Sequence, residues 1–294
     1  MKNLATGLGF LAALCMLPIA ALSIAGCNAD PAPAGSNAST SVAPSPAPLH
    51  ISPALPHGSA SLAEKGKRMA TLLGCRGCHG EDLHGKPWID EPEFAVLYSS
   101  NLTRAVPRYT DAQLDRAIRE GVRYDETPLW EMPSDAFLRL SAPDMDALIA
   151  YLRSVPPGGT DHPRMVLGPE GEKEVRAGTI VPTTDAVERA RDVEAVFAGA
   201  GNESGRYLAQ VVCGECHGPD LRGNPDPETY RPDLVVAASY SLAEFTTLLK
   251  TGNPTGGRKL ELMAQVSRSR FSHLTESEVD AIHAYLVARA AAPR

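Results

Sequence analysis

Apolar side chains recur along this chain at the spacing of amphipathic helices, and they do so in two matching sets. Each set has a first helix that opens on a glycine followed by a basic residue, then a second helix and a closing helix. Apolar positions three and four residues apart predict such helices. The three pairs cover residues 66–75 and 205–213, 109–121 and 240–252, and 140–154 and 274–288.

Short polar residues and glycines indicate where the later helices begin and end. The hydroxyl of Ser or Thr suits an N-cap, and glycine suits the position after a helix. The expected caps are Thr110, Ser141, Ser241 and Thr275, and the expected stops are Gly121 and Gly252. No strand-like alternation extends over a useful length, so the fold class is predicted to be mainly α.

The repetition predicts two tandem domains, and a chain of 294 residues is long enough for both. The first is expected over residues 59–156 and the second over residues 204–294. Residues 157–203 are expected to form an irregular linker, with one short helix over residues 185–197.

The chain begins with a long apolar segment that has the form of an export signal, with Lys2 as its only charge. The segment ends in "SIAGC", residues 23–27, which resembles the lipobox of bacterial lipoproteins. This resemblance implies removal of residues 1–26 and acylation of Cys27, which would anchor the protein to a membrane. An uncleaved membrane-spanning helix is the alternative. Residues 27–58, rich in Pro, Ala and Ser, are predicted to form an extended tether.

Composition narrows the possible partners and the source of the core. The net charge of −7 gives no basic excess, so nucleic acid is not expected as a partner. Aromatic residues make up only 5% of the chain, and the cores therefore need another source of apolar surface. Of the six cysteines, Cys15 lies in the expected signal and Cys27 is expected to carry lipid. The other four belong to the motifs described next, which leaves no pair for a disulfide.

The sequence Cys-x-x-Cys-His occurs twice, and it is the attachment sequence of c-type haem. Two thiols three positions apart can form thioethers with the two vinyl groups of one porphyrin, and the following imidazole can then bind the iron. We therefore predict two covalently attached haem c groups, each serving as apolar core material for one domain. The attachment residues are Cys75, Cys78, Cys213 and Cys216, and the proximal iron ligands are His79 and His217.

Three other interpretations of the motif compete with haem attachment. A redox-active dithiol is expected beside a βαβ pattern, which the sequence does not show. A zinc site could use all four thiolates, but the adjacent histidines would then have no role. Chance occurrence is disfavoured by the second copy, which lies within matching flanks.

A methionine thioether is the expected sixth ligand of each iron, because it suits low-spin haem and raises its reduction potential. Met132 and Met263 each lie between a second helix and a closing helix, in segments expected to be loops. A buried loop methionine without a ligand role is the alternative for each. His84 and His273 are the possible replacements, although both are more typical of surface histidines.

Both domains resemble class I cytochrome c domains. The first, with "SSNLTR" (99–104), "REGV" (119–122) and "MPSDAF" (132–137), resembles the cytochrome c subunits of periplasmic alcohol, aldehyde and sugar-acid dehydrogenases. The second has "TGNPTGGRKLELM" (251–263), a related pattern. The resemblance implies that Met132 and Met263 are axial ligands. Those subunits commonly hold three haems, whereas this chain has two attachment motifs.

Electron carriage is the function expected from two such sites. The predicted protein is a periplasmic dihaem cytochrome c, attached by lipid to a bacterial membrane, with Asn28 favouring the outer membrane. It would relay single electrons from a dehydrogenase or another donor to a respiratory acceptor, such as another cytochrome or a terminal oxidase. A dihaem enzyme such as a peroxidase is the alternative, and it would need one iron with an open position.

Overall fold

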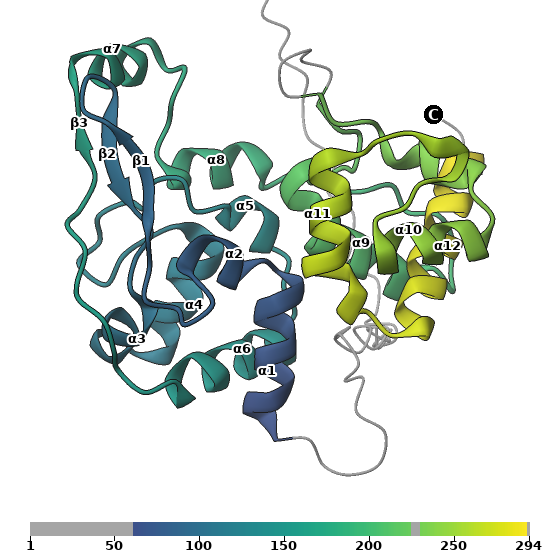
Figure 1. Ribbon diagram of the computed structural model, residues 1–294, viewed down its shortest axis with the longest axis horizontal. Helices are drawn as coiled ribbons and strands as arrows, with labels where there is room; N and C mark the ends of the chain where they lie inside the picture. The colour runs from purple at the N-terminus through teal and green to yellow at the C-terminus, as the bar shows by residue number, and fades with distance from the viewer. Residues whose placement is uncertain (1–60, 225–229, 293–294) are drawn as a thin grey trace, which may run out of the picture. The chain divides into compact units, whose positions relative to one another are not determined.

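Helices dominate the part of the chain that the structure describes, and the predicted fold class is confirmed (Figure 1). The computed structural model describes residues 61–224 and 230–292, which belong to one compact unit. The expected signal, Cys27 and the tether lie outside the described residues. None of the helices within the described ranges is long and apolar enough to cross a membrane.

The first set of predicted helices is present, with one interruption. Its main helices are α1 (Leu62–Leu72), α4 (Asp111–Glu120) and α6 (Ala142–Ser154). The first helix does not run straight into the attachment motif, because the chain adopts a left-handed conformation at Gly74 before α2 (Cys75–His79) begins.

The second set repeats this arrangement without the interruption. Here α9 (Glu203–His217) is continuous and includes the whole attachment motif at its C-terminal end. It is followed by α10 (Leu242–Thr251), α11 (Glu261–Ser269) and α12 (Glu276–Ala291). The predicted caps are confirmed. Side-chain oxygens accept hydrogen bonds from helix backbone N–H groups at all four expected positions, Thr110, Ser141, Ser241 and Thr275.

The same helix crossing occurs in both halves of the chain. α1 packs on α6, and α9 packs on α12, each time at a glycine near the start of the first helix. A Cβ atom built on Gly66 would lie 1.9 Å from the carbonyl oxygen of Ala147, and one built on Gly205 would lie 2.0 Å from that of Ala281. The glycine that opens each set therefore allows two helix backbones to touch.

A small antiparallel sheet is a feature that the sequence analysis did not predict. It has the order β1 (Pro87–Glu91), β2 (Ala95–Tyr98) and β3 (Val166–Leu167). The pairs Pro87–Tyr98 and Ile89–Leu97 are separated by a bulge, and Val96 pairs with Val166. The third strand therefore comes from the segment that was expected to be an irregular linker.

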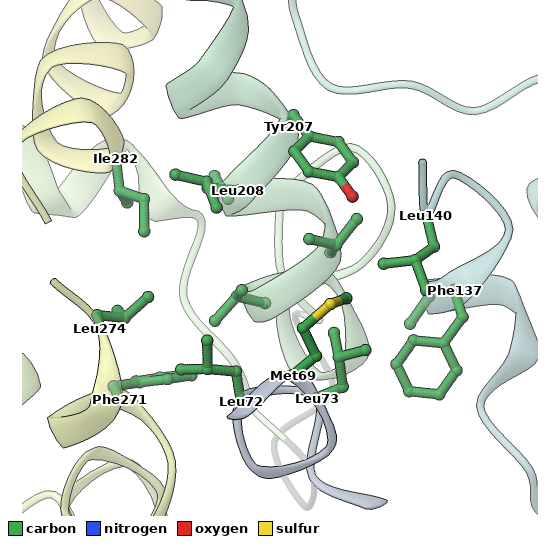
Figure 2. Close-up of a cluster of buried hydrophobic side chains, with 14 of the residues drawn as sticks. Met69, Leu72, Leu73, Phe137, Leu140, Tyr207, Leu208, Phe271, Leu274 and Ile282 are labelled. Atoms are coloured by element: carbon green, nitrogen blue, oxygen red, sulfur yellow. The ribbon is translucent and has the colours of Figure 1, made fainter. Parts of the chain in front are cut away.

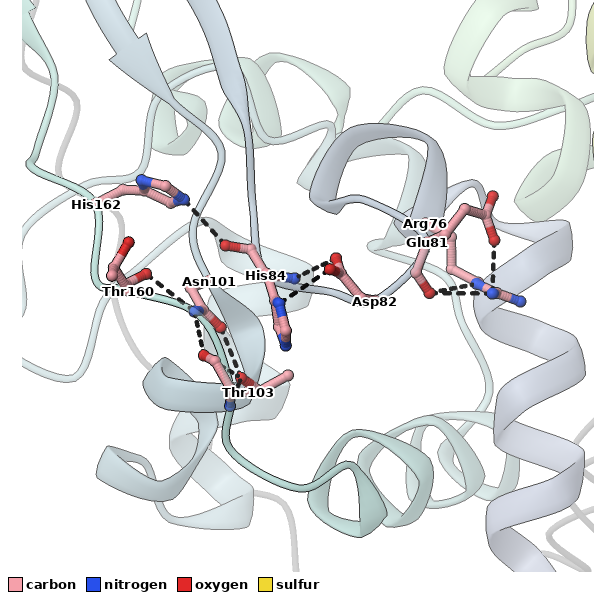
Figure 3. A network of polar contacts seen from close by, with 9 residues as sticks. Arg76, Glu81, Asp82, His84, Asn101, Thr103, Thr160 and His162 are labelled. Carbon is pink, nitrogen blue, oxygen red and sulfur yellow. Dashed lines mark hydrogen bonds and ion pairs between the residues drawn. The ribbon is translucent and has the colours of Figure 1, made fainter.

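Residues 157–203 contain more structure than expected. They include α7 (Pro169–Ala177), which was not predicted, and α8 (Thr183–Ala190), which begins two residues before the predicted helix and ends well before residue 197. The start of the segment is held to the first domain by the amide of Asn101, which donates to the carbonyl oxygens of Gly158 and Thr160 at 2.8 and 3.0 Å (Figure 3).

Short helical turns connect the longer elements. Two are α-helical, α3 (Leu102–Ala105) and α5 (Ser134–Phe137). The 3-10 turns are η1 (Val106–Arg108), η2 (Leu234–Ser239), η3 (Thr255–Gly257) and η4 (Phe271–His273).

A continuous cluster of buried apolar side chains joins the two halves (Figure 2). Figure 2 shows Met69 and Leu72 of α1 near Leu208 of α9 and Phe271 of η4. Burial of apolar surface is the main favourable contribution to such an interface. The two sets of helices therefore share core material.

Two buried polar contacts cross the same interface. The hydroxyl of Tyr207 donates to the carboxylate of Asp144 at 2.5 Å and accepts from the backbone N–H of Ser141 at 3.0 Å. The guanidinium of Arg68 forms a two-pronged ion pair with Glu278, whose side chain is only 4% exposed. Such contacts require specific geometry, so they fix the relative orientation of the two sets of helices.

Candidate haem sites

The four predicted attachment thiols lie on the two helices that carry the motifs. Cys75 and Cys78 are on α2, and Cys213 and Cys216 are on α9. All four are free thiols, and burial raises the pKa of Cys75 and of Cys213 to about 12. Redox-active cysteines have a lowered pKa instead, so these environments do not favour the dithiol interpretation.

A large apolar cavity adjoins the first motif. Cys75, Cys78 and His79 lie in its wall, and Met132 lines it as well. It contains about 1260 Å³ of space, a figure that includes the solvent at its open mouth. Its remaining walls are mainly aliphatic and aromatic, for example Leu97, Leu102, Val106, Tyr109, Ile118, Phe137 and Leu148.

Both predicted proximal histidines are oriented in the same way. Nδ1 of His79 lies 2.8 Å from the carbonyl oxygen of Ser100, and Nδ1 of His217 lies 2.9 Å from that of Pro232. A carbonyl oxygen only accepts, so each Nδ1 donates and each Nε2 keeps its lone pair. Burial lowers the pKa of both imidazoles, which favours the neutral form that binds metals. Histidines that bind a metal through one ring nitrogen usually donate the N–H of the other to such an acceptor.

The loop after each motif explains the repeated pattern His-Gly-x-Asp-Leu-x-Gly. The backbone N–H of Gly85 donates to the carbonyl of His79 at 2.7 Å, and that of Gly223 donates to the carbonyl of His217 at 2.8 Å. In both loops the aspartate side chain, from Asp82 or Asp220, accepts a backbone N–H two residues later at 3.0 Å. These local bonds turn the chain back toward its own helix.

The same loop also positions the histidine's partner. The carbonyl oxygen of the loop leucine accepts a hydrogen bond from a later backbone N–H. Leu102 donates to Leu83 at 2.8 Å, and Leu234 donates to Leu221 at 3.0 Å. The two accepting leucines, Leu83 and Leu221, have φ of 62° and are almost fully buried. Each bond joins the loop to the residues just after Ser100 or Pro232, whose carbonyl oxygen faces the histidine. The sequence repeat therefore encodes a repeated histidine support.

The structure places the two candidate methionine ligands in different local settings. Met132 lies in a loop, as predicted, and lines the cavity of the first motif. Met263 lies on α11, so the expectation of a loop there is wrong. Both are partly buried and pack against the core. The ligand role of each stays a prediction, and the cavity supports it for Met132.

His84, one of the possible replacements, is engaged elsewhere. Its Nδ1 lies 2.9 Å from the carboxylate of Asp82 (Figure 3). Its ring packs so closely on the chain that a Cβ built on Gly158 would lie 2.4 Å from Nε2. His273 lies in η4, where its carbonyl oxygen accepts from Nε of Arg68 at 3.0 Å.

Two residues that the sequence analysis did not single out line the first cavity. Trp88 of β1 contributes to the cavity wall and is 46% exposed. Glu215 reaches the same cavity from the second motif, where it lies between Cys213 and Cys216. Neither residue carries a local signal for this position, because both depend on tertiary packing.

The arrangement fits covalently bound haem. Paired thiols, a neutral imidazole held by its Nδ1, a methionine and an apolar cavity provide attachment, ligands and a dry environment. Within residues 61–224 and 230–292, no group of three or more His, Cys, Asp and Glu side chains is positioned to hold a metal ion. The two thiol pairs are therefore not gathered into one such group. The fold and the site define a c-type haem protein.

Comparison with known proteins leads to the same class. The sequence profile of the Cytochrome c family matches residues 63–156 and 203–289. Because these regions span more than half of the chain, the chain belongs to the cytochrome c family. Haem c is accordingly its cofactor.

Curated relatives extend over most of the chain. It is 28% identical over 254 residues to the fructose dehydrogenase cytochrome subunit of Gluconobacter japonicus, covering 76% of this chain and 51% of that protein. It is 27% identical over 277 residues to the cytochrome c subunit of a quinone alcohol dehydrogenase of Gluconacetobacter polyoxogenes, covering 79% and 56%. A diheme cytochrome c-type protein of Cereibacter sphaeroides is 26% identical over 274 residues, covering 81% and 90%. The chain thus spans about half the length of the two dehydrogenase subunits.

Proposed function

We propose that this protein is a dihaem electron carrier that relays single electrons from a dehydrogenase to a respiratory acceptor. One haem would be attached at Cys75 and Cys78, and the other at Cys213 and Cys216. Three findings support the proposal: the repeated histidine support, the two family matches, and relatives named as dehydrogenase cytochrome subunits or as a diheme cytochrome.

The observation that carries the proposal is the pairing of His79 and Met132 on the wall of one apolar cavity. A haem bound there supplies exchange of one electron between ferric and ferrous iron. His79 would hold the iron through Nε2, because Nδ1 is already committed to Ser100. Met132, in the wall of the same cavity, would supply its thioether as the second protein ligand.

The protein around the cavity performs the other tasks of a carrier. The aliphatic walls exclude water, and burial of haem is one of the factors that set its potential. The ion pairs and shared core between the two sets of helices keep the histidine supports fixed. A fixed ligand environment limits the rearrangement that accompanies a change of charge.

Location and membrane attachment are part of the same proposal. Cleavage before Cys27 and acylation of that residue would place the protein in the periplasm on a membrane, with the outer membrane favoured. The sequence at residues 23–27 supports this. A Cys27→Ala variant should lose the acyl mass and move from the membrane fraction to the soluble fraction. Unchanged partitioning of that variant contradicts lipid anchoring and leaves the haem sites unaffected.

Electron carriage is tested by potentiometric titration of the purified protein. The reduced protein is then mixed, in separate experiments, with an oxidised acceptor cytochrome and with hydrogen peroxide. We expect uptake of two electrons per chain and rapid reoxidation by an oxidised acceptor cytochrome. Hydrogen peroxide should react slowly and without turnover. Sustained peroxide turnover supports a dihaem peroxidase instead and contradicts the carrier.

A further inference from the structure

The guanidinium of Arg270 lies against the first haem-attachment helix, although Arg270 belongs to the second half of the chain. Arg270 follows α11 directly. A Cβ atom built on Gly74 would lie 2.0 Å from its Cζ, and one built on Gly77 would lie 3.5 Å from its Nη2. Gly74 has φ of 79°, a backbone conformation that favours glycine, and a side chain at this position would displace the guanidinium of Arg270.

Glu215, which also belongs to the second half, reaches the first motif as well. It is one of the two spacer residues between Cys213 and Cys216, and it lines the cavity of the first motif. Its carboxylate accepts a hydrogen bond from Nη1 of Arg270 at 2.5 Å. The side chains are 23% and 16% exposed. This largely buried ion pair therefore contacts both attachment motifs.

The charges of the pair lie beside both motifs. Arg270 contacts Gly74 and Gly77 at the first motif, and Glu215 is a spacer residue of the second. Three other charged groups face this region. The ammonium of Lys86 donates to the carbonyl of Gly77 at 2.7 Å, and Arg231 faces Cys216. Burial and, to a smaller extent, the charge of Glu215 raise the pKa of the Asp135 carboxyl group.

Stability alone does not account for an ion pair in this place. Removing two charges from water costs free energy, and apolar residues of similar volume often stabilise a protein as well or better. Charges that are only partly screened act strongly over short distances. Since reduction of ferric haem removes one positive charge, a nearby cation favours the reduced state and a nearby anion opposes it.

We propose that Glu215 and Arg270 form a shared electrostatic element that sets the reduction potentials of both haems together. Arg270 raises both potentials, and Glu215 lowers both. The two residues act on the haems through their charges and do not bind iron. The inference rests on the proposed attachment of one haem to each motif.

The test compares reduction potentials of the full-length protein and its variants by spectroelectrochemistry at one neutral pH. Glu215→Gln should raise the potentials of both haems, and Arg270→Gln should lower both. The double variant should return close to the wild type, and Arg270→Lys should retain the wild-type potentials. Glu172→Gln and Arg176→Gln, in the exposed ion pair on α7, serve as controls and should change neither.

Opposite shifts distinguish a charge effect from a loosened interface. Entry of water would move the potentials in the same direction in both single variants, and that result overturns the inference, as does a shift confined to one haem. Haem content is measured first by the haemochrome assay. Fewer than two haems per wild-type chain contradicts the proposed function, whereas two haems with unmoved potentials contradict only the shared element.

Discussion

Gly66 packs directly on the carbonyl group of Ala147, so closely that any side chain would overlap it. The equivalent contact in the second half joins Gly205 to Ala281. These two crossings hold the first and last helix of each domain together. In the second half, α9 carries both the crossing and the attachment motif.

Substitution of the glycine at the second crossing tests this packing. Gly205→Ala should destabilise the protein by about 1–3 kcal/mol, because overpacking a tight contact forces the helices apart. The measurement is guanidinium unfolding followed by circular dichroism. Ser204→Ala on the same helix is the control, because that position is exposed and lies outside the attachment motif. Equal stability of the two variants contradicts the role of the crossing.

The ion pair between Arg68 and Glu278 gives a second prediction on stability. Arg68→Met should destabilise the protein by about 3–5 kcal/mol, because it leaves the buried carboxylate of Glu278 without its cation. Arg176→Met removes one partner of an exposed pair on α7 and should change the free energy of unfolding by less than about 1 kcal/mol. If Arg68→Met lowers the free energy of unfolding no more than Arg176→Met does, the interface pair has no structural role.

Stability should also depend on pH through Asp125. A hydrogen bond from the Thr127 hydroxyl and an ion pair with Arg164 lower the pKa of its carboxyl group well below the usual range. The folded state therefore favours the charged form. Its contribution is present above the unfolded pKa of about 3.9 and is lost as the pH falls through the lowered folded value.

The variant Asp125→Asn should accordingly melt at a lower temperature than the wild type at pH 7, and the difference should narrow as the pH falls below about 4. Thermal unfolding at several pH values measures this difference. Asp146→Asn, which removes an exposed carboxylate on α6, is the control. A difference that grows with acidity has the wrong sign for this ion pair.

Removal of the thioether at Met132 tests the axial ligand of the first haem. Met132→Ala should convert one of the two irons to high spin and lower its reduction potential, because methionine ligation raises that potential. Electron paramagnetic resonance and redox titration detect both changes. Met145→Ala in the core should cost about 2–5 kcal/mol of stability and leave both irons low-spin. Two low-spin irons with unaltered potentials in Met132→Ala exclude Met132 as the ligand.

Features encoded by neighbouring residues were predictable from the sequence. The helix caps at Thr110 and Thr275 depend on side chains that bond within three residues, so their signal is local. The Cys-x-x-Cys-His motifs identified four thiols and two histidines for the same reason. The supporting carbonyls of Ser100 and Pro232 could not be identified in this way, because any residue type supplies a carbonyl.

Features that depend on distant segments were missed or misplaced. β3 consists of only two residues, Val166 and Leu167, and its partner lies far back in the sequence, so no alternation marks it. Met263 was expected in a loop, but α11 extends from Glu261 to Ser269 and contains it. The contact between Arg270 and Gly74 arises only when both halves pack together.

The number and spin state of covalently bound haems in the purified protein tests the central claim most directly. The haemochrome assay, intact mass after denaturation and electron paramagnetic resonance of the oxidised protein together measure both. The account predicts two covalent haems per chain and two low-spin ferric signals. Fewer than two haems, or a resting iron that is high-spin and readily binds cyanide, would contradict it.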